Sequence, residues 1–179
     1  MHRLDPDRLP EHLDRLFRAA WALSGSAQEA EDLVQETCAR VLAKPRLLRG
    51  DDELAYLVRV LHNTFVSGRR AASRRPVSEP LEKAPDPVDE RTGERPEEAA
   101  EARRVYGAIA ALRHEYRDVL VAVDLAGLTY REAAQALGLP EGTVMSRLYR
   151  ARKQIMRVLT PEHSPPGKES SRRPTRTQG

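Results

Sequence analysis

The residues best suited to a chemical task are the cationic and hydroxyl side chains between positions 141 and 157. Arg147 and Arg150 are three positions apart, which puts them on one exposed side of a predicted helix. An arginine on such a helix can reach a guanine edge or a phosphate in the major groove of DNA. Thr143 and Ser146, near the start of the same helix, can bond phosphates or bases. The pattern therefore indicates contact with duplex DNA.

The elements that would position these side chains have the pattern of a helix-turn-helix. Thr129 and Glu132 have the spacing of a capping box, which predicts that a helix begins there. Ala133 and Ala134 are small enough for this helix to cross its neighbour closely. Gly138 tolerates the positive φ that a tight turn requires. The second helix of the motif would then carry the cationic side chains.

A solvated basic face on a helical bundle would show the same charges. The formal net charge is only +3, so overall charge gives little support to nucleic-acid binding. On charge alone the two interpretations are about equally supported. The capping box, the alanine pair and the glycine turn together favour DNA binding.

Another helical unit is predicted over residues 7–75. Apolar residues recur at helical spacing over 7–24, and Ser26 has the pattern that begins a second helix. Pro45 ends that helix, because the residue before a proline disfavours helical backbone. An aspartate at 51–52 can cap a third helix, which runs into a cluster of arginines.

The segment between the two units differs from both. Residues 76–100 are rich in proline and acidic residues and poor in large apolar ones, which predicts a flexible acidic linker. Helical order is expected again over 101–159, and the tail 160–179 is expected to be disordered. The predicted fold class is all-α, with two small helical domains joined by the linker.

Composition supports this fold class and excludes several others. Aromatic residues make up only 4%, so Leu, Val and Ala must fill the core, which favours helices. The single cysteine, Cys38, cannot form an internal disulfide and falls on the apolar face of its helix. The sequence has no run of 18 apolar residues and no signal-peptide pattern, so we expect a cytoplasmic protein without membrane insertion.

An enzyme is not expected. The five histidines are scattered, without the spacing that metal ligands need. No glycine-rich loop of the kind that holds phosphates is present. We therefore predict no catalytic residues, no metal and no cofactor.

Three segments resemble bacterial sigma factors of the extracytoplasmic-function (ECF) type. Residues 141–152, EGTVMSRLYRAR, are similar to the helix with which that family reads the promoter −35 element. Residues 30–37, AEDLVQET, resemble its polymerase-binding helix, and residues 57–64, LVRVLHNT, resemble its −10-reading helix. The matches come in the family's order and are separated by a linker, which makes them more specific together than each is alone.

The resemblance implies a function, partners and three sets of residues. It implies a factor that binds core RNA polymerase, through its largest and second-largest subunits, and directs initiation at promoter DNA. The residues implied for polymerase binding are Asp32, Gln35, Glu36 and Arg40. Those implied for the −10 element are Tyr56, Arg59, Asn63, Arg69 and Arg70. Those implied for the −35 element are Arg131, Thr143, Ser146, Arg147 and Arg150.

Several alternatives stay open at this point. A stand-alone helix-turn-helix transcriptional regulator would share the C-terminal motif, and a helical adaptor would share the bundle. The linker is either a spacer or an acidic mimic of nucleic acid on polymerase. An anti-sigma factor is a further candidate partner. Met145 stands where the family commonly has lysine, and Tyr56 stands where it often has tryptophan. These differences bear on which promoter sequence is recognised and not on the resemblance to the family.

Overall fold

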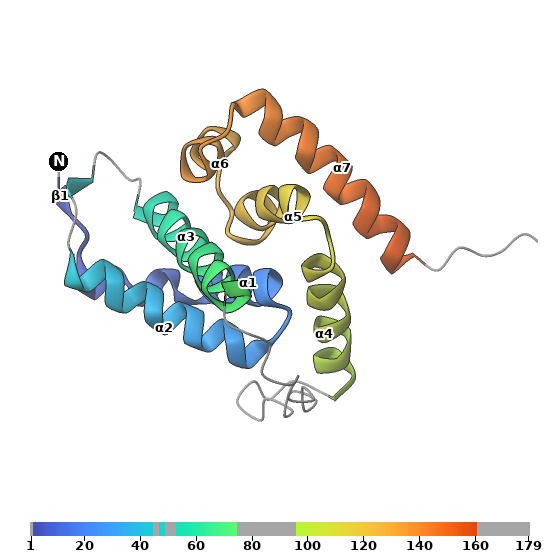
Figure 1. The fold of residues 1–179 in the computed structure, drawn as a ribbon, viewed down its shortest axis with the longest axis horizontal. Coiled ribbons are helices and arrows are strands. Elements are labelled where there is room, and N and C mark those ends of the chain that lie inside the picture. Colours follow the sequence, from blue (N-terminus) through green and yellow to red (C-terminus); the bar gives the residue numbers. More distant parts are fainter. Residues whose placement is uncertain (1, 45–46, 49–52, 75–95, 161–179) are drawn as a thin grey trace, which may run out of the picture.

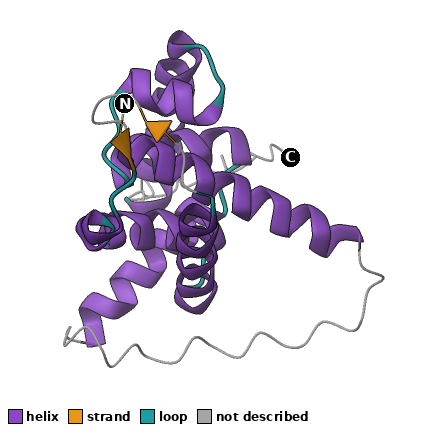
Figure 2. Cartoon of the chain, turned by 90° about the vertical axis from the view of Figure 1, so that its left-hand side faces the viewer, coloured by secondary structure: helices purple, strands orange, loops and turns teal. Residues whose placement is uncertain are grey.

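The computed structural model describes residues 2–44, 47–48, 53–74 and 96–160. In these ranges the regular structure is helical apart from one antiparallel pair of two-residue strands, β1 (His2–Arg3) and β2 (Leu47–Leu48), and short loops connect the elements (Figure 2). The all-α expectation is confirmed. The strand pair was not predicted, because two residues are too short to show the alternation that identifies a strand.

Helices α1, α2 and α3 form the N-terminal unit, together with a 3-10 turn and the strand pair (Figure 1). They are η1 (Pro6–Arg8), α1 (Pro10–Ser24), α2 (Ala27–Ala43) and α3 (Glu53–Arg74). Gly25 ends α1 in the left-handed conformation, with φ of +81°. The Ser26 hydroxyl then accepts a 3.3 Å hydrogen bond from the Glu29 N–H and begins α2, as predicted. The predicted stop at Pro45 and the predicted cap at 51–52 lie outside the described residues.

The C-terminal unit contains four α-helices and a π-helical turn. They are α4 (Pro96–Ala110), α5 (His114–Leu120), the π turn η2 (Val121–Leu125), α6 (Tyr130–Leu137) and α7 (Glu141–Leu159). Helix α4 begins inside the segment assigned to the linker, and Pro96 is its first residue. Proline fits there because the first turn needs no backbone donor from it. The rest of the linker, 76–95, and the tail beyond Thr160 lie outside the described residues.

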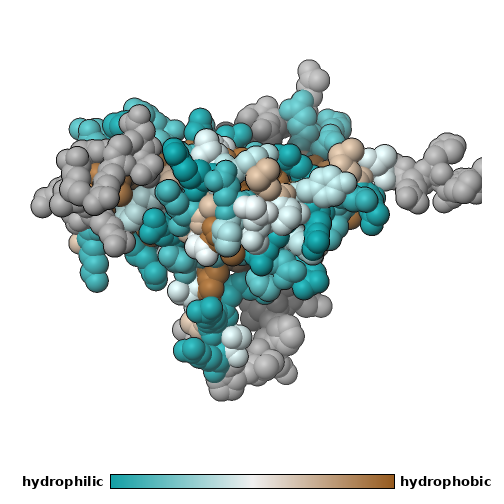
Figure 3. Space-filling view, turned by 90° about the horizontal axis from the view of Figure 1, so that it is seen from above, coloured by the Kyte–Doolittle hydropathy of each residue, from teal (hydrophilic) through white to brown (hydrophobic). Residues whose placement is uncertain are grey.

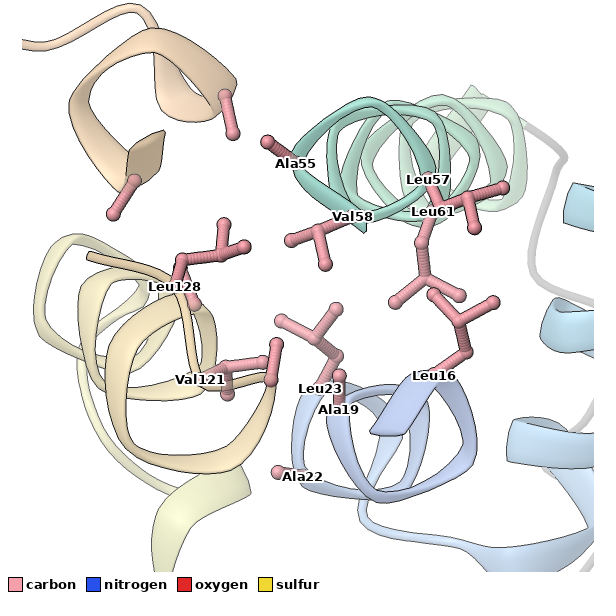
Figure 4. Packing of buried hydrophobic residues seen from close by; sticks show 14 of the residues in the cluster. Leu16, Ala19, Ala22, Leu23, Ala55, Leu57, Val58, Leu61, Val121 and Leu128 are labelled. Atoms are coloured by element: carbon pink, nitrogen blue, oxygen red, sulfur yellow. The ribbon is translucent and has the colours of Figure 1, made fainter. Parts of the chain in front are cut away.

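One hydrophobic core runs through both units. In Figure 4, Leu23 of α1 and Val58 of α3 point toward Val121 of η2 and toward Leu128, which follows that turn. Helix α1 packs against α2 and α3 on one side and against α4 and η2 on the other, while α3 also contacts α6. The sequence predicted two units but gave no sign that they would pack against each other.

Candidate nucleic-acid interface

The helix-turn-helix is formed by α6 and α7, and its capping box is complete. The Glu132 N–H donates to Thr129 Oγ1 at 3.3 Å, and the Thr129 N–H donates to Glu132 Oε2 at 2.7 Å. The side-chain and backbone hydrogen bonds from Thr129 lower the pKa of the Glu132 carboxyl. Gly138 ends α6 with φ of +67°, as the turn requires. The local prediction is confirmed in each of these respects.

Helix α7 packs one side against the C-terminal unit and leaves the other open. The packed side consists of Val144, Leu148, Ala151 and Ile155, all buried. Ser146 and Arg150 are exposed on the open side, and the Ser146 hydroxyl donates to the Thr143 carbonyl at 3.1 Å. Thr143 itself is half-buried. The exposed side chains on this helix are therefore free of the protein core, as an interface needs.

Arg147 departs from the expectation that it shares a fully exposed side with Arg150. It is half-buried, whereas Arg150 is exposed. The reason is its place on the helix, because Arg147 follows Val144 by three positions and precedes Ala151 by four, and both of those are buried. Its aliphatic stem lies at the edge of the packed side. An arginine at such an edge can lay its aliphatic stem on the apolar surface and keep its guanidinium group in water.

Met145 and Tyr149 are exposed on α7 beside the predicted site residues but were not among them. Met145 is 51% exposed and Tyr149 is 68% exposed. They are four positions apart, so they lie one above the other on the helix. Figure 3 views the molecule from the side that carries α6 and α7, and most of that face is hydrophilic, with a hydrophobic strip near its middle. Apolar side chains placed in a major groove contact the thymine methyl group, so both are candidates for base contact.

Arg152 has a positioning role that the sequence did not reveal. Its Nε and Nη2 donate to the two carboxylate oxygens of Asp124 at 2.9 and 2.6 Å. The hydrogen bonds and charge of Asp124 raise the pKa of the Arg152 guanidinium. This bidentate pair ties α7 to η2 and fixes how α7 is presented. The two residues are 28 positions apart, so no local pattern predicts the pair.

The remaining predicted −35 residue, Arg131, is exposed on α6 directly after its first residue. It lies next to Glu132, whose carboxylate belongs to the capping box. In helix-turn-helix proteins the first helix of the motif crosses the DNA backbone, so the prediction for Arg131 is a phosphate contact. The structure therefore puts Arg131 and Arg150 at the surface of the same motif.

The residues predicted for polymerase binding form one solvent-facing side of α2. Asp32, Gln35, Glu36 and Arg40 are all exposed, whereas Ala30, Leu33, Thr37 and Val41 of the same helix are buried. Arg40 Nε donates to Glu36 Oε1 at 2.6 Å, with both side chains about half exposed. An ion pair this exposed adds little stability, so it leaves both groups available to another protein.

Four of the residues predicted for the −10 element, Tyr56, Arg59, Asn63 and Arg70, follow one flank of α3, and Arg69 lies beside that flank on the side of Phe65. Asn63, Arg69 and Arg70 are exposed, while Tyr56 and Arg59 are half-buried. The Arg69 guanidinium lies 5.7 Å from the centroid of the Phe65 ring. The Nε of Arg59 is buried and has no hydrogen-bond partner among the described residues. Helix α3 therefore carries a partly covered basic flank, in contrast to the open side of α7.

Two further properties bear on the site. None of the helices in the described ranges combines the length and the apolar character that crossing a bilayer requires. Across the same ranges, no group of three or more His, Cys, Asp or Glu side chains is arranged to hold a metal ion.

Comparison with protein families matches each unit to a different region of one family. Residues 10–75 match the family described as Sigma-70 region 2, and residues 102–155 match Sigma-70, region 4. The first match covers α1 to α3, and the second covers the helix-turn-helix and the helices before it. Both the N-terminal and the C-terminal surfaces described above thus fall inside a matched region.

Curated relatives match over most of the chain. The ECF RNA polymerase sigma factor SigE of Mycolicibacterium smegmatis is 33% identical over 160 residues, which cover 86% of this chain and 60% of the relative. The ECF RNA polymerase sigma factor SigL of Mycobacterium tuberculosis is 33% identical over 152 residues, which cover 83% of this chain and 85% of the relative. The chain thus spans less than two thirds of the first relative and most of the second.

Solved structures with the same fold are also found. The sigma factor RpoE of Bartonella quintana, in a complex with the anti-sigma factor NepR, superposes with a TM-score of 0.65 and 25% identity over 86% of this chain and 94% of that one. CnrH, in a complex with the cytosolic domain of CnrY, superposes with a TM-score of 0.57 and 22% identity, covering 83% of this chain and 82% of that one. The second likeness concerns the fold alone.

Proposed function

This chain belongs to the ECF RNA polymerase sigma factors, and from that premise we propose that it binds core RNA polymerase and directs initiation at promoters with −35 and −10 elements. The observation that supports this most is the open side of α7, presented by a complete helix-turn-helix in the same chain as a region 2 unit. The N-terminal unit supplies the polymerase and −10 surfaces, and the C-terminal unit supplies the −35 surface.

The −35 element is read by α7 in the major groove. Arg150 is our first choice for a guanine, because its exposed side chain can offer two parallel donors to one base edge. Arg147 reaches the groove from the edge of the packed side, and Ser146 and Thr143 bond near the helix start. Arg131 on α6 contacts the phosphate backbone. Arg152 keeps α7 in place through Asp124.

The N-terminal unit binds polymerase through α2 and the −10 element through α3. The exposed side of α2 carries Asp32, Gln35, Glu36 and Arg40, whose charges and amide suit a polar interface on the polymerase clamp. On α3, Asn63 and Tyr56 contact an unstacked base, and Arg59, Arg69 and Arg70 hold the phosphates beside it. Helices that read two elements are thus joined in one chain.

A stand-alone helix-turn-helix regulator is not favoured. Such a protein would share the C-terminal unit but would have no use for a region 2 unit, which the match to residues 10–75 supports. In the proposed role the chain has no catalysis of its own, since polymerase forms the phosphodiester bonds. It acts in the cytoplasm with polymerase and DNA. An anti-sigma factor is a further partner, in line with the complex that contains RpoE and NepR.

Run-off transcription with bacterial core polymerase tests the proposal. A library of promoter fragments is transcribed with and without the chain, and initiation from a defined pair of elements is expected only with it. Arg150→Ala is expected to lower the use of the selected −35 sequence by roughly 5-fold to 100-fold, the range of one lost bidentate contact. Arg104→Ala is the matched control, because Arg104 is exposed on α4, is not part of either reading helix and pairs with Glu101 of its own helix.

Two results would contradict the proposal. If the chain binds DNA but never associates with core polymerase, the regulator takes the place of the sigma factor. If Arg104→Ala lowers initiation as much as Arg150→Ala does, the effect is one of general charge and α7 does not read the element.

A further inference from the structure

The segment before α1 folds back onto the part of the chain that precedes α3. Its strand β1 runs antiparallel to β2. Leu4 and Leu9, which flank η1, are buried, and so is Leu48 of β2. A strand pair of two residues is not stable by itself, so it depends on these buried leucines. The first residues of the chain are therefore fixed to the N-terminal unit at the strand that comes before α3.

A second contact, made by charged side chains, lies at the first residue of α3. Glu53 is only 3% exposed, and its Oε2 lies 3.1 Å from Arg8 Nη1 of η1. His12 Nε2 of α1 lies 3.7 Å from the same oxygen, which is beyond a hydrogen bond but close enough for an ion pair when the ring is protonated. The start of a helix also favours a carboxylate, because its first backbone N–H groups have no partner within the helix. The Glu53 carboxylate is thus held between α3 and residues 8–12.

This ion pair is better suited to fixing a geometry than to adding stability. Taking a carboxylate out of water consumes much of what its attraction to a guanidinium returns, and apolar side chains of similar size would pack there at lower cost. The pair is also directional, because the Arg8 side chain is 46% exposed and reaches a buried oxygen from the surface. A shift of the first turn of α3 would leave the buried carboxylate without this partner, so the pair selects one position of that turn.

The first turn of α3 carries a residue proposed to contact the −10 element. Tyr56 follows Glu53 by three positions, so the two are neighbours on the surface of the helix. A displacement of Glu53 therefore moves Tyr56 with it. The side of α2 proposed to bind polymerase carries none of the groups that hold Glu53, so its contacts are independent of this pair.

We infer that residues 2–12 form an N-terminal brace, which positions the first turn of α3 for the −10 element. The brace holds the chain at two points ahead of Tyr56, at β2 through backbone pairing and at Glu53 through Arg8. It acts on promoter DNA through Tyr56, so Arg8 and Glu53 are positioning residues. The inference rests on the proposed function, because it specifies how the −10 surface of that function is held in place.

Removal of the Arg8–Glu53 pair tests the brace. Arg8→Met keeps the length of the side chain without its charge, and Glu53→Gln keeps the shape of the carboxylate without its charge. Each full-length variant is assayed with core polymerase on two promoters that differ only in the −10 element, one selected by the unchanged chain and one scrambled. The ratio of initiation between them, the −10 selectivity, is expected to fall by about 3-fold to 10-fold, a part of what one base contact supplies. Selectivity for the −35 element and affinity for core polymerase are expected to stay unchanged.

The selectivity ratio separates positioning from a loss of stability. A variant that only unfolds more readily lowers the concentration of active factor, so initiation falls by the same factor at both promoters and the ratio is unchanged. Arg8→Lys keeps the charge and is expected to keep most of the selectivity. The double variant should lose no more than either single variant, because both remove the same pair. Arg18→Met is the matched control, since Arg18 is exposed on α1 and its Nε donates to the Asp14 carbonyl of the same helix at 3.4 Å.

Two further measurements address the brace without its charges and without transcription. Leu4→Ala removes a buried anchor of the segment and is expected to lower the −10 selectivity by about 2-fold, less than loss of the ion pair, because the strand pair contacts α3 less directly. Amide hydrogen exchange over residues 53–57 is expected to be faster in Arg8→Met than in Arg18→Met, because the first turn of α3 opens more often once the brace is loosened.

The outcomes separate the brace from the proposed function. If the unchanged chain never supports initiation, the proposed function is wrong and the brace is overturned with it. If the unchanged chain is selective, and the charge variants keep both their helical circular dichroism and that selectivity, the brace is wrong while the sigma function stands. An equal loss of selectivity in Arg18→Met would also overturn the brace. Should either charge variant fail to fold, the Leu4→Ala ratio and the comparison of Arg8→Lys with Arg18→Met decide in its place.

Discussion

Helices α3 and α7 are similar in length and in charge, but they differ in how much of their surface is open. Helix α3 has 22 residues and packs against α1 and α2 on one side and against α6 on another. Helix α7 has 19 residues, packs against the C-terminal unit along a single side and leaves the rest exposed. A basic amphipathic helix therefore indicates a binding surface only after its packing is known. Helix α7 is open along most of its surface, whereas α3 is partly covered by α1, α2 and α6.

The largest expected effect tests whether the two helices share one cooperative core. Leu148→Ala in α7 and Leu57→Ala in α3 each remove a fully buried side chain and are expected to lower the free energy of unfolding by about 2–5 kcal/mol. Trp21 is the only tryptophan and lies in the N-terminal unit. Denaturant unfolding followed by its fluorescence and by far-UV circular dichroism should give coincident transitions for both variants. Two separate transitions, with Trp21 unaffected by Leu148→Ala, would show independent units.

The next prediction separates two causes of lost stability. One is a clash where the two units meet, and the other is backbone strain alone. Gly25 and Gly138 both have positive φ, but a Cβ on Gly25 would lie 3.0 Å from the Ala110 Cβ, while one on Gly138 meets nothing within 4 Å. Gly138→Ala should therefore cost about 1 kcal/mol of left-handed strain, and Gly25→Ala about 2 kcal/mol or more. Thermal unfolding measures both. Equal losses would mean that α1 and α4 do not approach this closely.

A smaller effect concerns the cap of the helix-turn-helix, and it depends on pH. Glu132→Ala is expected to cost about 1 kcal/mol at neutral pH. The folded chain lowers the pKa of Glu132, so the stabilisation is complete above the ordinary carboxyl pKa and is lost as the pH falls through the lowered value. Ser26→Ala at the start of α2 is the control, since a hydroxyl cap does not titrate in this range. Urea titrations between pH 7 and pH 3 should show the two variants diverging.

The smallest effect concerns the open side of α7. Met145→Lys adds one cation there, which should raise affinity for any duplex and steepen the dependence of log affinity on log salt by about one unit. Gln28→Lys adds the same charge to exposed α2, away from DNA, and should leave the slope unchanged. Fluorescence anisotropy with a duplex at several salt concentrations measures both. Equal slopes for the two variants would place Met145 outside the interface.

Local signals in the sequence predicted the elements well. The Ser26 cap, the Thr129–Glu132 capping box and the glycine turns are each determined by residues within a few positions, so they can be read directly. The family resemblance and the all-α class followed from these segments and their order, and both are confirmed. The functional roles of the individual site residues remain predictions.

Contacts between distant residues could not be predicted in the same way. His62 and Asp118 are 56 positions apart, and their pairing depends on how two units pack, which no helical period encodes. The Arg152–Asp124 pair depends equally on tertiary structure. The exposure of Arg147 could not be predicted either, since it is half-buried. Helical spacing places a side chain around the helix axis but does not say where the packed side of the helix ends.

The π turn η2 makes the C-terminal unit sensitive to the exact number of residues in this segment. Its backbone widens by one residue, as the hydrogen bond from the Ala126 N–H to the Val121 carbonyl at 2.9 Å shows. Each residue of an α-helix turns the chain by about 100°. Removing one residue between 121 and 125 would restore ordinary helical winding and rotate Asp124 away from Arg152. A deletion of one residue here is therefore a change in the helical phase that orients α7, the helix proposed to read the −35 element.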